Sequence, residues 1–229
     1  MTCGLRYAKS DDMTSLAYIR ERTVRDVFDY QHLTACLDGY RKPRDKIRRL
    51  LAAGEIVRIR KGLYAFAEPY RRGPLSREWL ANLLYGPSYV SLDYALSRHG
   101  LIPERVETVT SITTGRSRRF DTPFGRFTYR HMTSRRFATG ADLVESDGAS
   151  FLMASAEKAL SDKVWTDRRF KATSRANCKA YLVEDLRIDP ARLAAMDRDR
   201  LSRIEAVYDS RKVSAFVRCL RSPEVNRHA

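Results

Sequence analysis

Apolar side chains recur at helical spacing through the first third of the chain, and they predict three short helices. The first covers residues 14–23, and the second covers residues 27–40 and ends near Gly39. The third begins at Pro43, whose fixed φ suits a first helical turn, and it stops at Gly54. The apolar positions that turn this third helix toward a core are Ile47, Leu50 and Leu51.

A β-hairpin is predicted directly after the third helix. The two predicted strands are residues 55–60, in which apolar and basic side chains alternate, and residues 63–66. Lys61 and Gly62 form a two-residue link between them, in which glycine readily takes a positive φ. The expected opposite pairs are Arg60 and Leu63, Ile59 and Tyr64, Arg58 and Ala65, and Val57 and Phe66. One face would then be apolar, formed by Val57, Ile59, Tyr64 and Phe66. Three helices followed by a basic hairpin predict a winged helix-turn-helix domain.

Basic side chains gather at the positions that such a domain uses to contact DNA. Helical spacing puts four charged residues on the outer face of the third helix: Asp45, Lys46, Arg48 and Arg49. Three more basic residues lie at the N-terminal end of this helix, Arg41, Lys42 and Arg44, and the hairpin carries Arg58, Arg60 and Lys61. The helix would enter the major groove and the hairpin would follow the adjacent backbone. Double-stranded DNA is therefore the predicted partner, with base contacts from Arg44, Asp45 and Arg48. The alternatives are a solvated helix face without a partner and a protein-binding module.

Composition agrees with an anionic partner. The 229 residues include 43 Lys and Arg against 28 Asp and Glu, a formal net charge of +15, with the excess larger toward the N-terminus. A hydrophobic content of 43% is enough for a buried core. The chain has neither the run of about 18 apolar residues that spans a bilayer nor the apolar core of a signal peptide at its start. A cytoplasmic protein without a membrane partner is the expectation.

The rest of the chain predicts a second domain of mixed structure. Prolines and a glycine in residues 68–76 are typical of a linker, so the domains expected are residues 1–72 and 73–229. Beyond the linker, the patterns predict helices over 76–86 and 91–100, strands over 107–114, 116–120 and 126–132, a helix over 155–168, and a helical tail. The predicted fold class is α+β, with an N-terminal winged helix-turn-helix and a mixed α/β domain that ends in helices.

Residues 115–136 form a second basic segment. It holds seven arginines and one acid, interleaved with Phe120, Phe124, Phe127 and Tyr129. Aromatic and basic residues in this pattern can bind nucleic acid, but the alternation is also that of an ordinary half-buried strand. Both interpretations remain open at this stage.

Little in the sequence points to catalysis, a metal or a cofactor. Ser155 and Lys158 have the Ser-x-x-Lys spacing of penicillin-recognising enzymes, but the companion Ser-Asp-Asn and Lys-Thr-Gly motifs are missing, so a helix cap is expected. The cysteines Cys3, Cys36, Cys178 and Cys219 are far apart and form no metal-ligand spacing. No glycine-rich phosphate loop occurs. We expect a protein that is not an enzyme and uses no cofactor or metal.

Three segments of the second domain resemble the AbiEi antitoxins. These segments are the stretch from Tyr89 to Pro103, the Thr-Ser-Ile-Thr-Thr run that begins at Thr110, and Ala156-Glu157-Lys158-Ala159-Leu160. The resemblance covers roughly residues 25–220 and includes the layout of a winged helix joined to a larger antitoxin domain.

The resemblance implies a bacterial type IV toxin–antitoxin operon linked to abortive phage infection. Members of this family bind inverted repeats in their own promoter through the N-terminal domain. Their C-terminal domain counters an AbiEii-like nucleotidyltransferase toxin without a stable complex. By position, the DNA contacts would come from the helix between Arg41 and Arg49 and from Arg58, Arg60 and Lys61. The competing hypotheses are a ligand-responsive regulator with an apolar sensor pocket in its second domain, and an enzyme that acts through Ser155 and Lys158.

Overall fold

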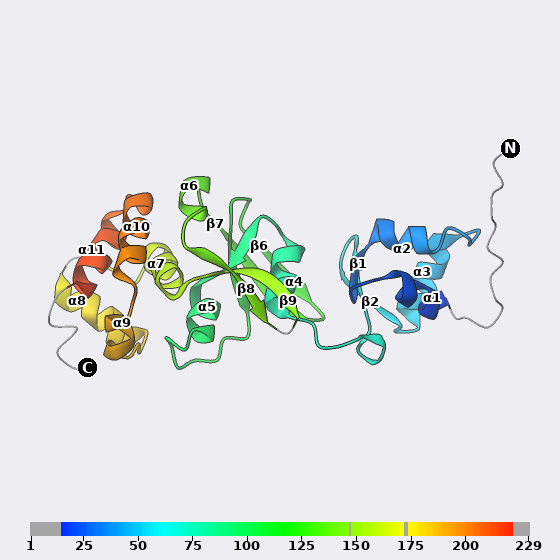
Figure 1. The fold of residues 1–229 in the computed structure, drawn as a ribbon, viewed down its shortest axis with the longest axis horizontal. Coiled ribbons are helices and arrows are strands. Elements are labelled where there is room, and N and C mark those ends of the chain that lie inside the picture. Colours follow the sequence, from blue (N-terminus) through cyan, green and yellow to red (C-terminus); the bar gives the residue numbers. More distant parts are fainter. Residues whose placement is uncertain (1–14, 147, 172–173, 222–229) are drawn as a thin grey trace. The chain divides into compact units, whose positions relative to one another are not determined.

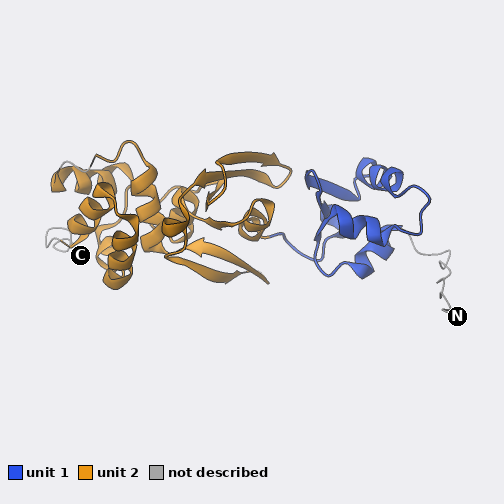
Figure 2. Ribbon diagram, turned by 90° about the horizontal axis from the view of Figure 1, so that it is seen from above, with its two compact units in different colours: residues 1–75 blue, residues 76–229 orange. Residues whose placement is uncertain are grey.

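The computed structural model describes residues 15–146, 148–171 and 174–221. Thr14, the first residue of the first predicted helix, and the cysteine Cys3 lie outside these ranges. The chain forms two compact units, residues 1–75 and 76–229, which Figure 2 colours separately. Helices and strands occur in both units, so the protein is of the mixed α+β class (Figure 1). The division after Leu75 falls close to the boundary that the sequence predicts at residue 72.

Unit 1 combines short helices with a three-stranded antiparallel sheet. Its elements are α1 (Ser15–Arg22), β1 (Val27–Asp29), α2 (Tyr30–Cys36), α3 (Pro43–Ala52), β2 (Ile56–Arg60), β3 (Leu63–Phe66) and the 3₁₀ turn η1 (Glu68–Tyr70). The strand order is β1-β3-β2, so β3 lies in the centre. The predicted helix at Pro43 is present, and its Ile47 and Leu50 are buried in the core of the unit.

The helix predicted over residues 27–40 is wrong at both ends. Val27 and Phe28 are buried in β1, where they pair with Ala65 and Tyr64 of β3. This pairing is distant in sequence, so the local helical spacing could not indicate it. The helix begins only at Tyr30, because the Asp29 side chain accepts a hydrogen bond from the His32 backbone N–H at 2.7 Å and so caps α2.

The predicted hairpin is present, but its register changes next to the turn. Arg60 lies opposite Leu63 as expected, whereas Arg58 pairs with Tyr64, because the register shifts between Arg58 and Arg60. The expected pairs Ile59–Tyr64, Arg58–Ala65 and Val57–Phe66 are therefore wrong. A bulge of this kind lets two residues three positions apart, Ile56 and Ile59, both face the core. Ile56 thus takes the buried place predicted for Val57.

The predicted linker is partly folded onto unit 1. Its first residues form η1, and Arg72 then returns to the loop before β1. The Arg72 guanidinium contacts Asp26 at 3.0 Å and also donates to the carbonyl oxygens of Arg20 and Thr23. The Arg72 backbone N–H donates to the other Asp26 oxygen at 2.8 Å. Arg72 therefore belongs to unit 1.

Unit 2 is built on a six-stranded sheet with the order β6-β7-β5-β4-β9-β8. The strands are β4 (Ser88–Val90), β5 (Val109–Thr113), β6 (Arg118–Thr122), β7 (Gly125–His131), β8 (Ala141–Ser146) and β9 (Ala149–Ala154), and the helices among them are α4 (Arg77–Leu84), α5 (Leu92–Arg98), α6 (Ser134–Phe137) and α7 (Ala156–Thr166). Strands β5, β6 and β7 confirm the sequence pattern. Strands β4, β8 and β9 were not predicted.

The two faces of the sheet carry different helices. Tyr129 of β7 donates its hydroxyl to the Ala81 carbonyl of α4, whereas Tyr89 of β4 donates to Asp162 of α7. Alternation along the strands puts these two tyrosines on opposite faces, because Tyr89 lies opposite Ile112 while Tyr129 is in register with Ser111. α4 therefore covers one face, and α7 with its neighbour α5 covers the other (Figure 1).

The tail is helical, as its spacing predicts. It contains α8 (Arg175–Ala180), a π-helical turn η2 (Tyr181–Asp185), α9 (Pro190–Ala194), α10 (Arg198–Tyr208) and α11 (Arg211–Leu220). Leu201, Ile204 and Tyr208 of α10 and Val213, Phe216, Val217 and Leu220 of α11 are buried. Helices α10 and α11 both contact α7. Among the described residues, no helix has the length and apolar character needed to cross a bilayer.

Candidate functional site

The basic residues predicted for DNA contact lie largely at the surface of unit 1. We call the following set the basic surface: Arg41, Lys42, Arg44, Lys46, Arg48, Arg49, Arg58, Arg60 and Lys61. All of them are exposed except Lys46, which is half-buried like its neighbour Asp45. Ile47 and Leu50 anchor the opposite side of α3 in the core, so the helix is held with its basic side outward.

Tyr30 brings the start of α3 and the tip of the hairpin together. Its backbone N–H donates to the Gly62 carbonyl in the hairpin turn at 2.9 Å. Its hydroxyl accepts a hydrogen bond from Arg44 Nε at 3.2 Å. A single residue at the start of α2 therefore contacts both parts of the basic surface. The positive φ of Gly62, +84°, is what allows the chain to turn at this point.

The basic surface is not neutralised by acids. Within the residues that the structure describes, none of its side chains forms an ion pair with a carboxylate, whereas Arg72 of the same unit pairs with Asp26. Unit 2 differs, since its arginines and lysines repeatedly pair with acids, as in Arg105–Glu107 and Lys163–Asp93. A solvated surface helix is usually laced by such pairs. The arrangement therefore leaves guanidinium and ammonium groups available to phosphates.

A groove of about 370 Å³ lies where α2 meets α3. It is lined by Tyr30, Thr34, Lys42, Pro43, Arg44 and Asp45. Lys42 occupies the N-cap position of α3, its carbonyl accepts the N–H groups of Asp45 and Lys46, and Pro43 has no N–H. The positive end of the helix dipole and the cations Lys42 and Arg44 favour an anion at this point. Asp45 adds an acceptor that could contact the amino group of cytosine.

The second basic segment, residues 115–136, forms the β6–β7 hairpin and the turn that follows. Its aromatic side chains are not arranged for stacking on bases, because Phe127 and Tyr129 are buried and Phe120 packs against Tyr129 with ring centroids 5.7 Å apart. Hydrogen bonds from Arg126 and Arg119 lower the pKa of the Asp121 carboxyl. The interleaved pattern is therefore that of a half-buried strand, and contact with nucleic acid through the arginines stays a prediction.

Ser155 and Lys158 do not form a nucleophile and base pair. The Ser155 hydroxyl accepts a hydrogen bond from the Lys158 backbone N–H at 3.2 Å and caps α7, as predicted. The Lys158 ammonium lies elsewhere: it donates to the Arg136 carbonyl and to the Tyr208 hydroxyl, each at 2.7 Å. The Lys158 side chain is therefore not placed to act as a base for the Ser155 hydroxyl.

Lys158 instead belongs to a buried polar cluster that sequence reasoning missed. Its ammonium lies 3.3 Å from Asp162, and both side chains are fully buried. Asp162 also accepts hydrogen bonds from Tyr208, Tyr89 (3.0 Å) and Ser91 (2.6 Å). Burial lowers the pKa of Lys158 and raises that of both tyrosines. The cluster joins β4, α7 and α10, and it has a structural role.

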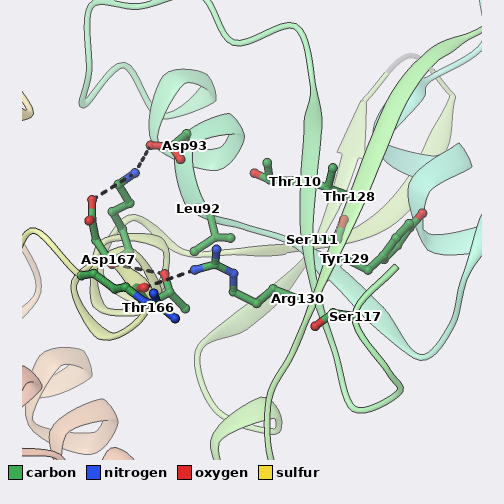
Figure 3. A pocket seen from close by; sticks show the side chains of 12 residues that line it. Leu92, Asp93, Thr110, Ser111, Ser117, Thr128, Tyr129, Arg130, Thr166 and Asp167 are labelled. Atoms are coloured by element: carbon green, nitrogen blue, oxygen red, sulfur yellow. Dashed lines mark hydrogen bonds and ion pairs between the residues drawn. The ribbon is translucent and has the colours of Figure 1, made fainter. Parts of the chain in front are cut away.

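A polar pocket of about 860 Å³ opens in unit 2 (Figure 3). It lies between β5 and β7 on one side and the start of α5 with the C-terminal end of α7 on the other. Its lining residues are Leu92, Asp93, Thr110, Ser111, Ser117, Thr128, Tyr129, Arg130, Lys163, Thr166, Asp167 and Arg168. These residues come from separate segments, so no sequence motif could indicate the pocket. Its lining is polar, unlike the apolar pocket expected of a ligand-responsive regulator.

The described residues contain no cluster of three or more His, Cys, Asp or Glu side chains placed to hold a metal ion. Cys36, Cys178 and Cys219 are buried. No protein-family model matches this sequence, and a comparison with curated proteins found no match. The resemblance to the AbiEi antitoxins therefore stays a prediction from the sequence motifs.

Proposed function

We propose that unit 1 is a winged helix-turn-helix domain and that the protein is a DNA-binding repressor of its own promoter. The observation that carries the proposal is the basic surface, which has no carboxylate partner in the described part of the chain and spans both α3 and the hairpin. In this role α3 enters the major groove, and Arg58, Arg60 and Lys61 contact the neighbouring phosphates.

The topology of unit 1 supports the same proposal. Its elements follow the order helix, strand, helix, helix and hairpin, and the first strand pairs with the second strand of the hairpin. This pairing fixes the hairpin beside the helices, and Tyr30 ties the turn at Gly62 to Arg44 at the start of α3. A helix and a wing that are held together can contact one DNA segment at once.

DNA binding is tested with a fragment from immediately upstream of the gene. We expect the purified protein to bind this fragment more tightly than a scrambled fragment of equal length. Replacing Arg44 and Arg48 by alanine should weaken binding by roughly 1–3 kcal/mol for each side chain that contacts a base. Fluorescence anisotropy at fixed salt measures both affinities.

The matched control replaces two exposed arginines of unit 2, Arg203 and Arg218, by alanine. This variant has the same change in net charge and should bind the promoter within about twofold of the unaltered protein, since exposed charges that do not belong to the basic surface are screened by salt. If both double variants bind equally, the basic surface is not the DNA site.

We further propose that the protein is an antitoxin of the AbiEi type. The motifs that carry the resemblance contact one another inside unit 2. Tyr89 and Ser91 from the first motif share the buried polar cluster with Lys158 from the third, and Thr110 from the second donates to the Ser91 carbonyl. Residues of this kind determine a fold, which supports a shared architecture for the second domain. Neutralisation of a nucleotidyltransferase-like toxin is the activity that the likeness implies.

Co-expression tests the antitoxin activity. The toxin to use is any nucleotidyltransferase-like protein that the neighbouring gene encodes, and we expect its growth inhibition to be relieved when this protein is produced. The Arg44→Ala, Arg48→Ala variant should still relieve it when expressed from a foreign promoter, because the proposed activity belongs to unit 2. Persistent growth arrest with normal levels of the unaltered protein would refute the antitoxin role.

A further inference from the structure

The polar pocket of unit 2 contains two acids, and both already have cationic partners. Lys163 lies 2.7 Å from Asp93 and 3.6 Å from Asp167. Asp167 also pairs with Arg169 at 2.9 Å and accepts a hydrogen bond from the Tyr181 hydroxyl. Partial burial opposes ionisation of Asp167, but the hydrogen bonds from Arg169 and Tyr181 outweigh it and hold the pKa of this carboxyl well below its usual range. The negative charges of Asp93 and Asp167 are therefore already neutralised by neighbouring cations.

Two guanidinium groups of the pocket, by contrast, have no carboxylate partner among the described residues. Arg130 extends from β7 across the pocket, where one of its terminal N–H groups donates to the Thr166 carbonyl at 3.2 Å (Figure 3). Arg168 is exposed and lies just after α7, which ends at Thr166. Among the described residues neither Arg130 nor Arg168 pairs with a carboxylate. The pocket consequently carries excess positive charge on two of its walls.

Hydroxyl groups also line the pocket. Thr110 and Thr128 are in register on β5 and β7, and their side chains share the sheet face on which Arg130 lies. Thr110 is already engaged, since it donates to the Ser91 carbonyl. Ser117 accepts a hydrogen bond from the His131 backbone N–H at 3.0 Å and keeps its own proton to donate. Thr128 and Ser117 can therefore bind a polar ligand.

We propose that this pocket binds a small phosphorylated metabolite of mononucleotide size. A phosphate dianion offers three oxygens and can accept hydrogen bonds from both Arg130 and Arg168, which suits guanidinium groups better than a single carboxylate does. A cavity of about 860 Å³ is within the size range of small-molecule sites. The remaining polar groups, among them Thr128 and Ser117, can contact the sugar or other polar part of the ligand.

The site is separate from the proposed DNA surface. All of its lining residues belong to unit 2, and none belongs to the basic surface of unit 1. Ligand binding can therefore be measured whether or not the protein recognises its promoter, and failure of one proposal leaves the other standing. If both hold, the protein combines promoter binding with a sensor for a phosphorylated metabolite.

The experiment is isothermal titration calorimetry on the full chain. The probes are the four ribonucleoside 5′-monophosphates and ribose 5-phosphate, the four nucleosides and ribose without phosphate, inorganic phosphate, and a 5′-phosphorylated tetranucleotide. We expect at least one organic phosphate to bind saturably with one site per chain. Its nucleoside or sugar without phosphate and inorganic phosphate should each bind at least about tenfold more weakly, because each lacks one half of the contacts.

Variants assign the binding to the pocket. Arg130→Gln with Arg168→Gln should weaken binding of the same probe at least about tenfold. Arg116→Gln with Arg203→Gln changes two exposed arginines outside the pocket by the same charge and should stay within about twofold of the unaltered protein. Thermal unfolding of the unliganded variants checks that each is folded, as expected for exposed positions.

Several outcomes would overturn the proposal. These are the absence of saturable binding for every organic phosphate, equal weakening in both double variants, and inorganic phosphate binding as tightly as the best organic phosphate. Saturable binding of a 5′-phosphorylated tetranucleotide without binding of any small organic phosphate would also overturn it. That result would mean that the pocket binds the phosphorylated end of a nucleic-acid strand.

Discussion

At the scale of single residues, the buried ion pair of Lys158 and Asp162 is the most consequential feature of unit 2. Both side chains are removed from water, and the neighbouring hydroxyls of Tyr208, Tyr89 and Ser91 supply hydrogen bonds to the pair. A buried charge without such partners is strongly destabilising. The pair is therefore stable only as a complete cluster.

Removal of one partner should have a large effect. We expect Lys158→Met to lower the free energy of unfolding by about 3–5 kcal/mol, because the carboxylate of Asp162 loses its buried counter-charge. Urea denaturation followed by circular dichroism measures this change. The exposed Lys61→Met supplies the control and should change stability by less than about 0.5 kcal/mol.

The double variant Lys158→Met, Asp162→Leu should be more stable than Lys158→Met alone, since it leaves no isolated charge in the core. If the double variant is the less stable of the two, the destabilisation in Lys158→Met arises from packing and not from the unpaired carboxylate.

The sequence predicted the roles of residues whose partners are close in the sequence. It did not predict the roles of residues whose partners are far away in the sequence. Ser155 was predicted as a cap because its partner, the N–H of Lys158, is one helical turn away. The ammonium of Lys158 contacts Tyr208, which lies 50 positions further along the chain, and no local pattern indicates that contact. The residues of the polar pocket escaped prediction for the same reason.

At the scale of elements, the proposed DNA binding gives α3 and the hairpin different roles. Side chains near the start of α3, such as Arg44, would contact bases, whereas Arg58, Arg60 and Lys61 would contact phosphates. Phosphate contacts release counterions, so they determine how steeply affinity falls with salt. The two elements should therefore be separable by experiment.

Replacing Arg58, Arg60 and Lys61 by alanine should weaken binding to promoter and scrambled DNA by similar factors. The slope of log affinity against log salt should become shallower by about one for each phosphate that is no longer neutralised. Anisotropy titrations from low to moderate salt measure the slope. An unchanged slope together with a loss of sequence preference would mean that the hairpin contacts bases.

Element boundaries follow from the sequence where capping and helical spacing agree. Pro43 and the spacing of Ile47 and Leu50 predicted α3 correctly. The strand at Val27 was missed because its residues become a strand only by pairing with β3. Strand β4 is three residues long and lies between β5 and β9, so its neighbours and not its own pattern determine its conformation.

At the scale of the whole molecule, the chain contains two units with separate cores. The core of unit 1 is formed by residues between Leu16 and Phe66, with Tyr70 packed against it. Arg72 adds hydrogen bonds to Asp26 and to the carbonyls of Arg20 and Thr23. A unit with its own core and anchored end can fold independently.

We expect a fragment of residues 1–75 to unfold cooperatively and to keep promoter binding. A fragment that ends at residue 71 should have a melting temperature lower by several degrees, because it lacks the contacts of Arg72 with Asp26. Differential scanning calorimetry compares the two. Equal melting temperatures would mean that the Arg72 contacts contribute no stability.

The position of Tyr208 has a consequence for how the protein is made. Translation proceeds from the N-terminus, so α7 leaves the ribosome well before α10, and Lys158 meets its hydroxyl partner only when Tyr208 has been synthesised. A nascent or prematurely terminated chain that stops before this tyrosine holds its Lys158 and Asp162 charges in an interior that is not closed. We expect such a product to be digested faster by a protease than a chain that contains Tyr208, because its second unit cannot complete the buried cluster.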